Sequence, residues 1–432
     1  MKRFCVAAVV SFVIAVMLAV AGAGTSATVS RQYIVVLKPG ADRAAAETSA
    51  RGLGGDVFEE YKHALNGFAV RLPDAAAPSL RSNPAVSFIS LDGEVTAAAQ
   101  STQALPAGID RIDGDRSSTR SGDGRNAVAI NVAVIDTGID ADHPDLNVVG
   151  GIDCASGKSF DDQNGHGTHV AGTIAAVDNG IGVVGVAPGA RLWAIRVLDK
   201  HGVGNLSKLL CGIDFVTSTR TDSDPTNDIT VANMSLTAGG SDDGSCGALN
   251  KDAFHAAICN SVAHGITYAV AAGNSGQDFQ EVVPASYSEV LTVTAVADYD
   301  GKPGGLGSQT CLNEFFEIPD DQAAFFSDFA TLPEDRAHTI DAPGVCVLST
   351  FAGGGYELIS GTSQASPHAA GTVALCIAAG PCAGLTPVQI IQKIVSDDAA
   401  YNSANRGYGF QGDPFRPISG KYYGYLIRAG LY

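Results

Sequence analysis

Three short segments of the chain carry the residue types that nucleophilic catalysis requires. Asp136 ends the apolar run AVID, His166 lies in NGHGTHVAGTIAA, and Ser363 lies in SGTSQASPHAAG. A serine hydroxyl is a poor nucleophile until an adjacent imidazole takes its proton, and the imidazole needs a carboxylate to fix its tautomer. The three residues together therefore predict a serine nucleophile, with His166 as general base and Asp136 as the acid that orients it.

Each segment taken alone also allows a simpler interpretation. Asp136 could cap a turn at the end of a strand, and Ser363 could be only the N-cap of a helix. A zinc site at His166 and His169 would lack the helical glutamate of the metalloprotease pattern, and its histidines would be spaced i, i+3. We therefore expect His169 to be structural.

The elements that must position these residues follow an α/β pattern. From Ala127 onward, short β-branched runs alternate with helical patterns, which predicts a mostly parallel sheet with helices on both faces. Active sites of such sheets lie at the carboxyl ends of strands. The predicted strands are 131–135, 191–198, 229–234, 266–271 and 290–296, and two late helices run from Ser363 or Gln364 to about Ala379 and from Pro387 to about Val395.

A small α+β domain is predicted before this sheet. Its strands are QYIVVLK at 32–38, GFAVRL at 67–72 and VSFISL at 86–91, with a helix near 44–53. The following stretch, AAAQSTQ at 97–103, is small, polar and without periodicity, as linkers exposed to cleavage are. The sequence thus predicts a small domain at 28–99 and a large one at 100–432.

The amino terminus has the layout of a secretory signal peptide. Basic residues at 2–3 precede an apolar run from Phe4 to Ala21, and small residues follow through Ala27. We expect residues 1–27 to be removed and the protein to be secreted without a stable membrane anchor. The alternative is an uncleaved anchor, for which the run is long enough.

Charge and cysteine content suit an exported protein that does not bind nucleic acid. The chain has 45 acidic and 27 basic residues and a formal net charge of −18, which disfavours contact with phosphate backbones. The cysteines after the leader are even in number and suited to disulfides, with free buried thiols as the alternative: Cys154, Cys211, Cys246, Cys259, Cys311, Cys346, Cys376 and Cys382. Their full pairing stays open, although Cys246 with Cys259 and Cys376 with Cys382 would close short local loops.

Taken together and in this order, the three segments resemble the subtilisin family of serine proteases, over about residues 103–400. YIVVLK and GFAVRL resemble the inhibitory propeptide of the same family, and Gln103, Pro106 and Gly108 match the element at which mature members begin. The resemblance implies a subtilisin-like fold and a zymogen that is activated by cleavage between Ala97 and Thr102. It implies a monomeric serine endopeptidase that cleaves polypeptides through an acyl-enzyme on Ser363, with broad specificity and no catalytic cofactor.

The resemblance also assigns further site residues. The side-chain amide of Asn274, in VAAGNSG, would donate to the oxyanion beside the backbone N–H of Ser363, the alternative being a plain turn. Edge segments that pair with extended substrate and apolar pockets would supply the substrate-binding residues Gly202, Gly204, Leu206, Leu209, Ser235, Leu236, Ala271 and Gly273. A structural Ca²⁺ is expected on oxygen donors of Gln103, Asp145, Val177, Asn179, Ile181 and Val183, unless the loop 177–184 is an ordinary turn.

Two departures from the family pattern affect these expectations. Gln364 stands where most members have methionine after the nucleophile, which predicts resistance to peroxide because a thioether is absent there. Thr237 and Ala238 replace two glycines beside the bound peptide, so the pocket assignments depend on the added side chains.

Two rival functions remain open from the sequence. A catalytically inactive binding protein of the same fold has no need for the four residues Asp136, His166, Asn274 and Ser363. An exopeptidase or a transpeptidase could use the same acyl-enzyme, which either water or an amine can capture.

Overall fold

A computed structural model of the chain describes residues 30–92, 103–125, 127–309, 311 and 317–432. The chain divides into two compact units, Met1–Ala99 and Gln100–Tyr432. The predicted leader, most of the predicted linker and the expected cleavage region lie outside the described residues. Among the described residues, no helix is both long and apolar enough to cross a membrane.

The first unit is the predicted small α+β domain. Its antiparallel sheet has the order β2-β3-β1-β4, and alternate residues of β1, including Val35 and Leu37, enter its core. The sequence prediction missed β2 because its residues, DVFEEY, are polar and mostly exposed at the sheet edge. The elements are β1 Ser30–Leu37, α1 Arg43–Gly52, β2 Asp56–Tyr61, β3 Gly67–Pro73, α2 Ala77–Arg81 and β4 Val86–Leu91.

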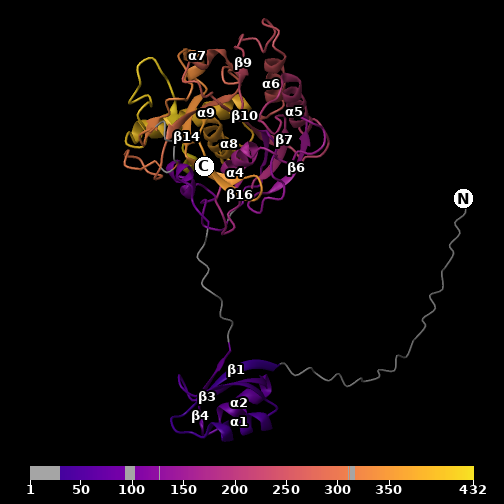
Figure 1. The fold of residues 1–432 in the computed structure, drawn as a ribbon, viewed down its shortest axis with the longest axis vertical. Helices are drawn as coiled ribbons and strands as arrows, with labels where there is room; N and C mark the ends of the chain where they lie inside the picture. Colours follow the sequence, from indigo (N-terminus) through magenta and orange to yellow (C-terminus); the bar gives the residue numbers. More distant parts are fainter. Residues whose placement is uncertain (1–29, 93–102, 126, 310, 312–316) are drawn as a thin grey trace, which may run out of the picture. The chain divides into compact units, whose positions relative to one another are not determined.

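The second unit has the predicted mostly parallel sheet. Its strand order is β17-β14-β12-β10-β8-β5-β7-β6, and β13 pairs antiparallel with β12. Figure 1 shows β14, β10, β7 and β6 in this order across the unit. The strands of this path are β5 Asn131–Asp136, β6 Val148–Asp153, β7 Arg191–Arg196, β8 Ile229–Met234, β10 Thr267–Ala271, β12 Leu291–Ala297, β13 Gln322–Ala323, β14 Thr339–Val345 and β17 Tyr425–Leu426.

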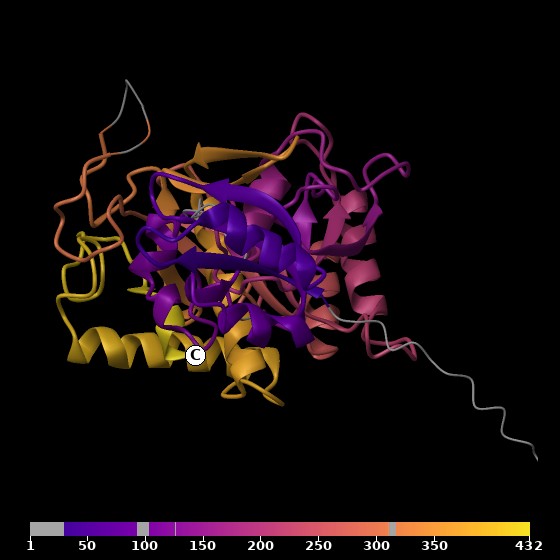
Figure 2. The same cartoon turned by 90° about the horizontal axis from the view of Figure 1, so that it is seen from below.

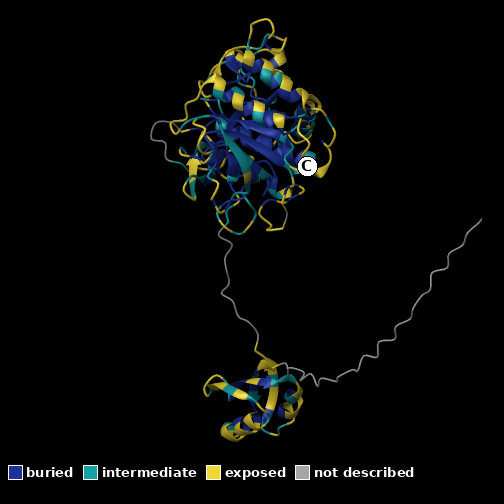
Figure 3. Cartoon of the chain, turned by 90° about the vertical axis from the view of Figure 1, so that its right-hand side faces the viewer, coloured by how far each residue is buried: buried dark blue, intermediate teal, exposed yellow. Residues whose placement is uncertain are grey.

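Helices cover both faces of this sheet, as predicted. Val132 and Val134 of β5 belong to the core under α4, α8 and α9, whereas Ala133 and Ile135 belong to the core under α5 and α6. In Figure 3 the strands are buried between helices that carry exposed stripes. The helices are α3 Ala107–Arg111, α4 His166–Ala175, α5 Leu206–Ser218, α6 Ala253–Ala263, α7 Pro333–Arg336, α8 Thr362–Ala379 and α9 Pro387–Ala404. β15 Val347–Phe351 and β16 Gly355–Ile359 form a hairpin, and β9 Ala238–Gly239 pairs antiparallel with the distant β11 Val282–Val283.

The predicted end of the last helix near Val395 is wrong. The capping box of Thr386 and Gln389 starts α9 as expected, but the helix continues to Ala404. Its polar stretch is not a break, because Asp398 and Asn402 are buried there. Figure 2 shows α9 beside the C-terminus, where the Tyr432 hydroxyl donates to Asp397 at 2.9 Å.

Four disulfides connect the second unit: Cys154–Cys211, Cys246–Cys259, Cys311–Cys346 and Cys376–Cys382. The two local pairs favoured by the sequence are both present.

Candidate active site

Asp136 is the last residue of β5 and is fully buried. One of its carboxylate oxygens, Oδ1, accepts the backbone N–H of Thr137 at 2.7 Å. The chain then turns sharply at Gly138, which has φ +108° and no room for a Cβ, because such an atom would lie 2.3 Å from the Phe160 carbonyl oxygen. The turn holds the carboxylate at the carboxyl end of the sheet.

His166 opens α4 directly above this turn. Its Nδ1 lies 2.7 Å from Asp136 Oδ1. The helix can approach so closely because residue 167 is glycine: a Cβ there would lie 2.2 Å from the carbonyl oxygen of Gly138. With its Nδ1–H donating to Asp136, a neutral imidazole keeps Nε2 free to accept a proton.

The surroundings of His166 also raise the pKa of its imidazole. Burial acts to lower the pKa of the imidazole, but the negative charge of Asp136 and the hydrogen bond to it outweigh burial and raise the pKa above its usual value. Asp162 adds to this effect, and its carboxylate also accepts the N–H groups of Asn164, Gly165 and Thr168. Asp162 thus holds the loop that presents His166, a role that the sequence prediction missed.

Ser363 is the second residue of α8, and its hydroxyl donates to the carbonyl oxygen of Ser235 at 3.3 Å. Ser235 directly follows β8, and it lines the same cavity as His166. Asp136, Ser235 and Asn274 lie at or just beyond the carboxyl ends of the neighbouring strands β5, β8 and β10. Proton transfer from Ser363 to His166 would require the hydroxyl to turn from this carbonyl toward the imidazole.

Two hydrogen bonds from Thr362 fix the orientation of the Asn274 amide. Its Oδ1 accepts both the backbone N–H and the hydroxyl of Thr362, at 2.8 and 3.0 Å. This assignment leaves the Nδ2 hydrogens to donate elsewhere, next to the start of α8, where the helix N-terminus favours negative charge. The arrangement can stabilise an oxyanion near Ser363.

A residue that the sequence prediction missed holds the Asn274 loop. Asp328 Oδ1 accepts the backbone N–H groups of Ser275 and Gln277, both at 2.9 Å, and the N–H of Asp328 donates to the carbonyl of Gly273. Burial raises the pKa of this carboxyl above its usual value. Asp328 lies far along the chain from the loop, so no local pattern indicates this contact.

Replacement of Asn274 by alanine is expected to lower kcat about 10²–10³-fold with little change in KM, the usual effect of removing one oxyanion donor. The donor is needed only when the oxyanion develops, so ground-state binding loses little. Steady-state kinetics on a peptide anilide will measure the change. Asn405→Ala, at an exposed position after α9, is the matched control, and an equal loss in both variants would contradict the assignment.

Most predicted substrate-binding residues surround one cavity of about 470 Å³. Gly202, Gly204, Leu206, Leu209, Ser235 and Leu236 line it together with His166. Ala271 and Gly273 are instead buried at the end of β10 and are not part of this lining. The sequence prediction missed Phe254, which reaches the cavity from α6 and adds an apolar wall.

The predicted calcium residues also lie together. The carbonyl oxygens of Val177 and Val183 converge on the Gln103 side-chain nitrogen at 2.7 and 2.8 Å, and Asp145 Oδ2 accepts the Val183 N–H. Asp145 Oδ1 is buried without a hydrogen-bond partner, and burial raises the pKa of this carboxyl to about 6. Asn179 hydrogen-bonds to Asp145, whereas no contact places the Ile181 carbonyl in the cluster. Gln103 Oε1 accepts the Gly180 N–H, so the amide must turn to present its oxygen to this cluster, and with that change the donor set fits a hard cation.

His169 has the structural role that we expected. Its Nε2 lies 3.0 and 3.1 Å from the carbonyl oxygens of Val347 and Glu357, and burial lowers its pKa to about 4. It therefore joins α4 to the β15–β16 hairpin.

Gln364 is buried beside Ser363, and its amide has no sulfur for peroxide to oxidise. Met234 is the one methionine after the leader and is fully buried in β8, and the cysteines after the leader are all in disulfides. Activity is therefore expected to survive brief peroxide treatment, whereas Gln364→Met should become sensitive. Residual activity after peroxide checks this, and loss of activity by the unaltered enzyme at constant fold would contradict it.

Comparisons with known proteins agree with this fold. Residues 128–410 match the Subtilase family, and residues 32–98 match Peptidase inhibitor I9. A thermostable alkaline protease of Halalkalibacterium halodurans is 36% identical over 380 residues, covering 88% of this chain and 89% of that protein. Subtilisin E of Bacillus subtilis is 34% identical over 370 residues, covering 83% of each chain.

A solved structure gives the same result. The crystal structure of a cold adapted subtilisin-like serine proteinase aligns with a TM-score of 0.54 and 27% identity, over 75% of this chain and 98% of that one. The fold and the similarities define a serine protease made as a zymogen, with its inhibitor domain ahead of the protease domain. The chain belongs to the subtilase family.

Proposed function

We propose that the mature chain is a secreted endopeptidase that hydrolyses polypeptides through an acyl-enzyme on Ser363. The observation that carries this proposal is the 2.7 Å contact between His166 Nδ1 and Asp136 Oδ1 at a cavity shared with Ser235, the hydrogen-bond acceptor of Ser363. No catalytic cofactor enters the reaction.

Each residue has a defined role in this mechanism. His166 Nε2 takes the proton of the Ser363 hydroxyl as the oxygen attacks the peptide carbonyl, and later gives that proton to the leaving amine. Asp136 keeps the imidazole in the required tautomer and stabilises the imidazolium. Asn274 Nδ2 and the Ser363 backbone N–H donate to the oxyanion.

Substrate binding follows from the cavity. An extended peptide would pair with the backbone of 202–204 and 235–236 as an added strand. The apolar side chains of Leu206, Leu209 and Leu236 support broad specificity with a preference for apolar residues, and Phe254 extends this surface. We propose that Ala271 and Gly273 contribute only from beneath this surface, because both are buried and the Gly273 N–H donates to the hydroxyl of Thr362, next to the nucleophile.

The precursor arrangement is part of the proposal. Residues 1–27 would direct export and be removed, 28–99 would inhibit the protease in the precursor, and 100–432 would form the active enzyme. Four disulfides support an extracellular location. We propose that the mature enzyme is a monomer without a membrane anchor.

The residues around Asp145 would hold a structural Ca²⁺, with ligands from Gln103, Asp145, Val177, Asn179, Ile181 and Val183. Bound calcium would stabilise the fold and take no part in the chemistry. In Ser363→Ala protein, calcium at about 100 times its Kd is expected to add about 2.7 kcal/mol to the free energy of unfolding. Thermal unfolding with calcium or with EGTA measures this, and an equal gain in Asp145→Asn would contradict the site.

Fluorophosphonate labelling tests the function directly. The processed protein should become labelled at Ser363, as mapped by mass spectrometry, and should lose casein hydrolysis in proportion to labelling. Internal fragments from a long peptide indicate an endopeptidase, and only short end-products would favour an exopeptidase. A folded, processed protein that neither labels nor hydrolyses casein would indicate an inactive binding protein.

A further inference from the structure

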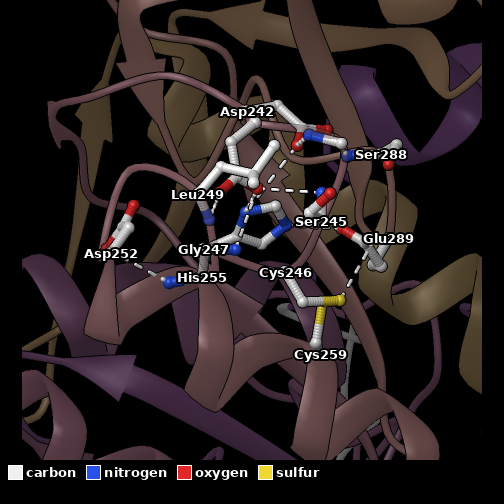
Figure 4. Close-up of a disulfide and its surroundings, with 12 residues drawn as sticks. Asp242, Ser245, Cys246, Gly247, Leu249, Asp252, His255, Cys259, Ser288 and Glu289 are labelled. Carbon is white, nitrogen blue, oxygen red and sulfur yellow. Dashed lines mark hydrogen bonds and ion pairs between the residues drawn. A yellow bond between two sulfur atoms is a disulfide. The ribbon is translucent and has the colours of Figure 1, made fainter.

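A buried histidine outside the proposed active site faces a group of carboxylates. His255 is on the first turn of α6, and Asp242 and Asp243 lie in the loop that leads from β9 to this helix. The disulfide Cys246–Cys259 joins the loop to α6. Figure 4 shows His255 next to Asp242 and this disulfide.

One ring nitrogen of His255 has a hydrogen-bond partner, and the other has none. Nε2 lies 2.9 Å from Glu289 Oε2, and the ring stacks on Tyr287 with a centroid distance of 4.0 Å. Nδ1 has no hydrogen-bond partner, and because the side chain is 0% exposed, water cannot serve as one from the surface. A buried ring nitrogen without a partner is costly, so the groups around it matter.

Two carboxylate oxygens lie within 4 Å of Nδ1. Asp242 Oδ1 lies 3.7 Å away and Asp243 Oδ1 lies 3.6 Å away, both too long for a hydrogen bond. The same separations suit ligands that share one small cation. With metal–ligand bonds of about 2.0–2.2 Å, neighbouring donors of a tetrahedral zinc ion are roughly 3.4 Å apart.

We propose that His255 Nδ1, Asp242 and Asp243 bind a divalent transition-metal cation, zinc by preference. Imidazole with carboxylates is a ligand set that zinc accepts, and water would complete the tetrahedron. Glu289 accepts the Nε2–H, which fixes the tautomer that presents a lone pair at Nδ1, as carboxylates commonly do for histidines that bind metals.

The hydrogen bonds of the loop hold its carboxylates in place. Asp242 Oδ1 accepts one backbone N–H, from Gly244, and keeps a lone pair for a metal. Asp243 Oδ1 accepts two, from Ser245 and Gly247, and would exchange one of them for the metal, while its Oδ2 stays held by the N–H groups of Leu249 and Asn250.

The local charge also favours a cation. Among the described residues, the ion pairs of Asp242, Asp243 and Glu289 include no lysine or arginine. Asp242 also lines a cavity of about 400 Å³, in which Glu281, Glu334 and Asp335 are the other acidic residues and no lysine or arginine contributes. A divalent cation would balance this charge and could reach the site through the cavity.

The site would stabilise one wall of the cavity near His166. The residues that flank this loop, Ala238 and Phe254, both line that cavity. This consequence for substrate binding rests on the proposed function, whereas cation binding itself does not.

The test uses the full chain carrying Ser363→Ala, stripped of metal and kept in excess calcium so that the calcium site is filled. Calorimetric titration with Zn²⁺ should show one site, and Co²⁺ should give a tetrahedral absorption spectrum. Asp242→Asn and His255→Gln should abolish this binding, and Glu289→Gln should weaken it about 10–100-fold. Asp300→Asn, in a separate acidic cluster, is the matched control and should bind normally.

Two results would overturn the proposal. One is the absence of zinc binding by the folded chain, accompanied by NMR signals of a doubly protonated His255, which would make the imidazolium itself the balancing cation. The other is zinc binding that His255→Gln leaves unchanged. Neither result depends on protease activity, so either is distinguishable from failure of the proposed function.

Discussion

Exchange of Ser363 for alanine is expected to lower kcat on a peptide substrate about 10⁶-fold, the magnitude known for the nucleophile of subtilisin. In the proposed mechanism the hydroxyl oxygen forms the acyl bond, and alanine has no atom that can replace it. His166→Ala should cost about as much, and the double variant should lose little more, because a base without a nucleophile has no proton to remove. Steady-state kinetics on a peptide anilide will provide kcat and KM.

Controls separate this effect from misfolding. Ser396→Ala changes an exposed serine on α9 and should leave kcat unchanged. The Ser363→Ala protein should keep the circular dichroism spectrum of the unaltered protein and should still bind the separate inhibitor domain. Additive losses from the two single variants would show that Ser363 and His166 do not act as one unit.

Sequence alone was most informative where the residues that a structural feature requires are close together in the chain. The Asp136 and His166 segments contain glycines that the structure requires, because Gly138 and Gly167 let a strand end and a helix start approach each other. Buried parallel strands such as Ile229–Met234 were predicted closely, because continuous β-branched runs between helical patterns are typical of strands buried on both faces.

Prediction failed where distant packing decides the structure. β14, Thr339–Val345, contains Pro343 and Gly344, which argue against a strand, yet it pairs with β12 through a register shift at this point. The glycine-rich tail supplies β17 only because β14 offers it a parallel edge. The extent of α9 depends on buried Asp398, whose neighbours are not evident from sequence.

The same limit applies to the site. Phe254, Asp328 and Asp162 act through contacts with backbone or side chains outside their own local patterns, so residue type alone did not indicate them. In the sequence, His255, Asp242 and Asp243 look like ordinary solvent-exposed polar residues. Only the fold shows that Nδ1 is buried and faces both carboxylates.

Asp136→Asn is expected to lower kcat by about 3 × 10⁴-fold, as loss of the corresponding residue does in subtilisin. The asparagine amide can donate to His166 Nδ1, which favours the tautomer with the proton on Nε2. That tautomer cannot accept the Ser363 proton. KM should change little, because Asp136 is fully buried and does not line the cavity.

The pH profile provides an independent test of the same assignment. The charge of Asp136 raises the pKa of His166, and catalysis requires the neutral imidazole, so activity is lost as pH falls through this pKa. Without that charge the pKa falls, and the acidic limb of the kcat/KM profile should move to lower pH. Asp142→Asn, at an exposed position nearby, should leave the limb in place.

A limb that does not move in Asp136→Asn would mean that another group titrates there. The Thr137 N–H and His166 Nδ1 share Asp136 Oδ1, so an amide nitrogen in its place gives up the Thr137 contact, and the circular dichroism spectrum of the variant must be compared with that of the unaltered protein. A shifted limb with a preserved fold would assign the effect to the lost charge.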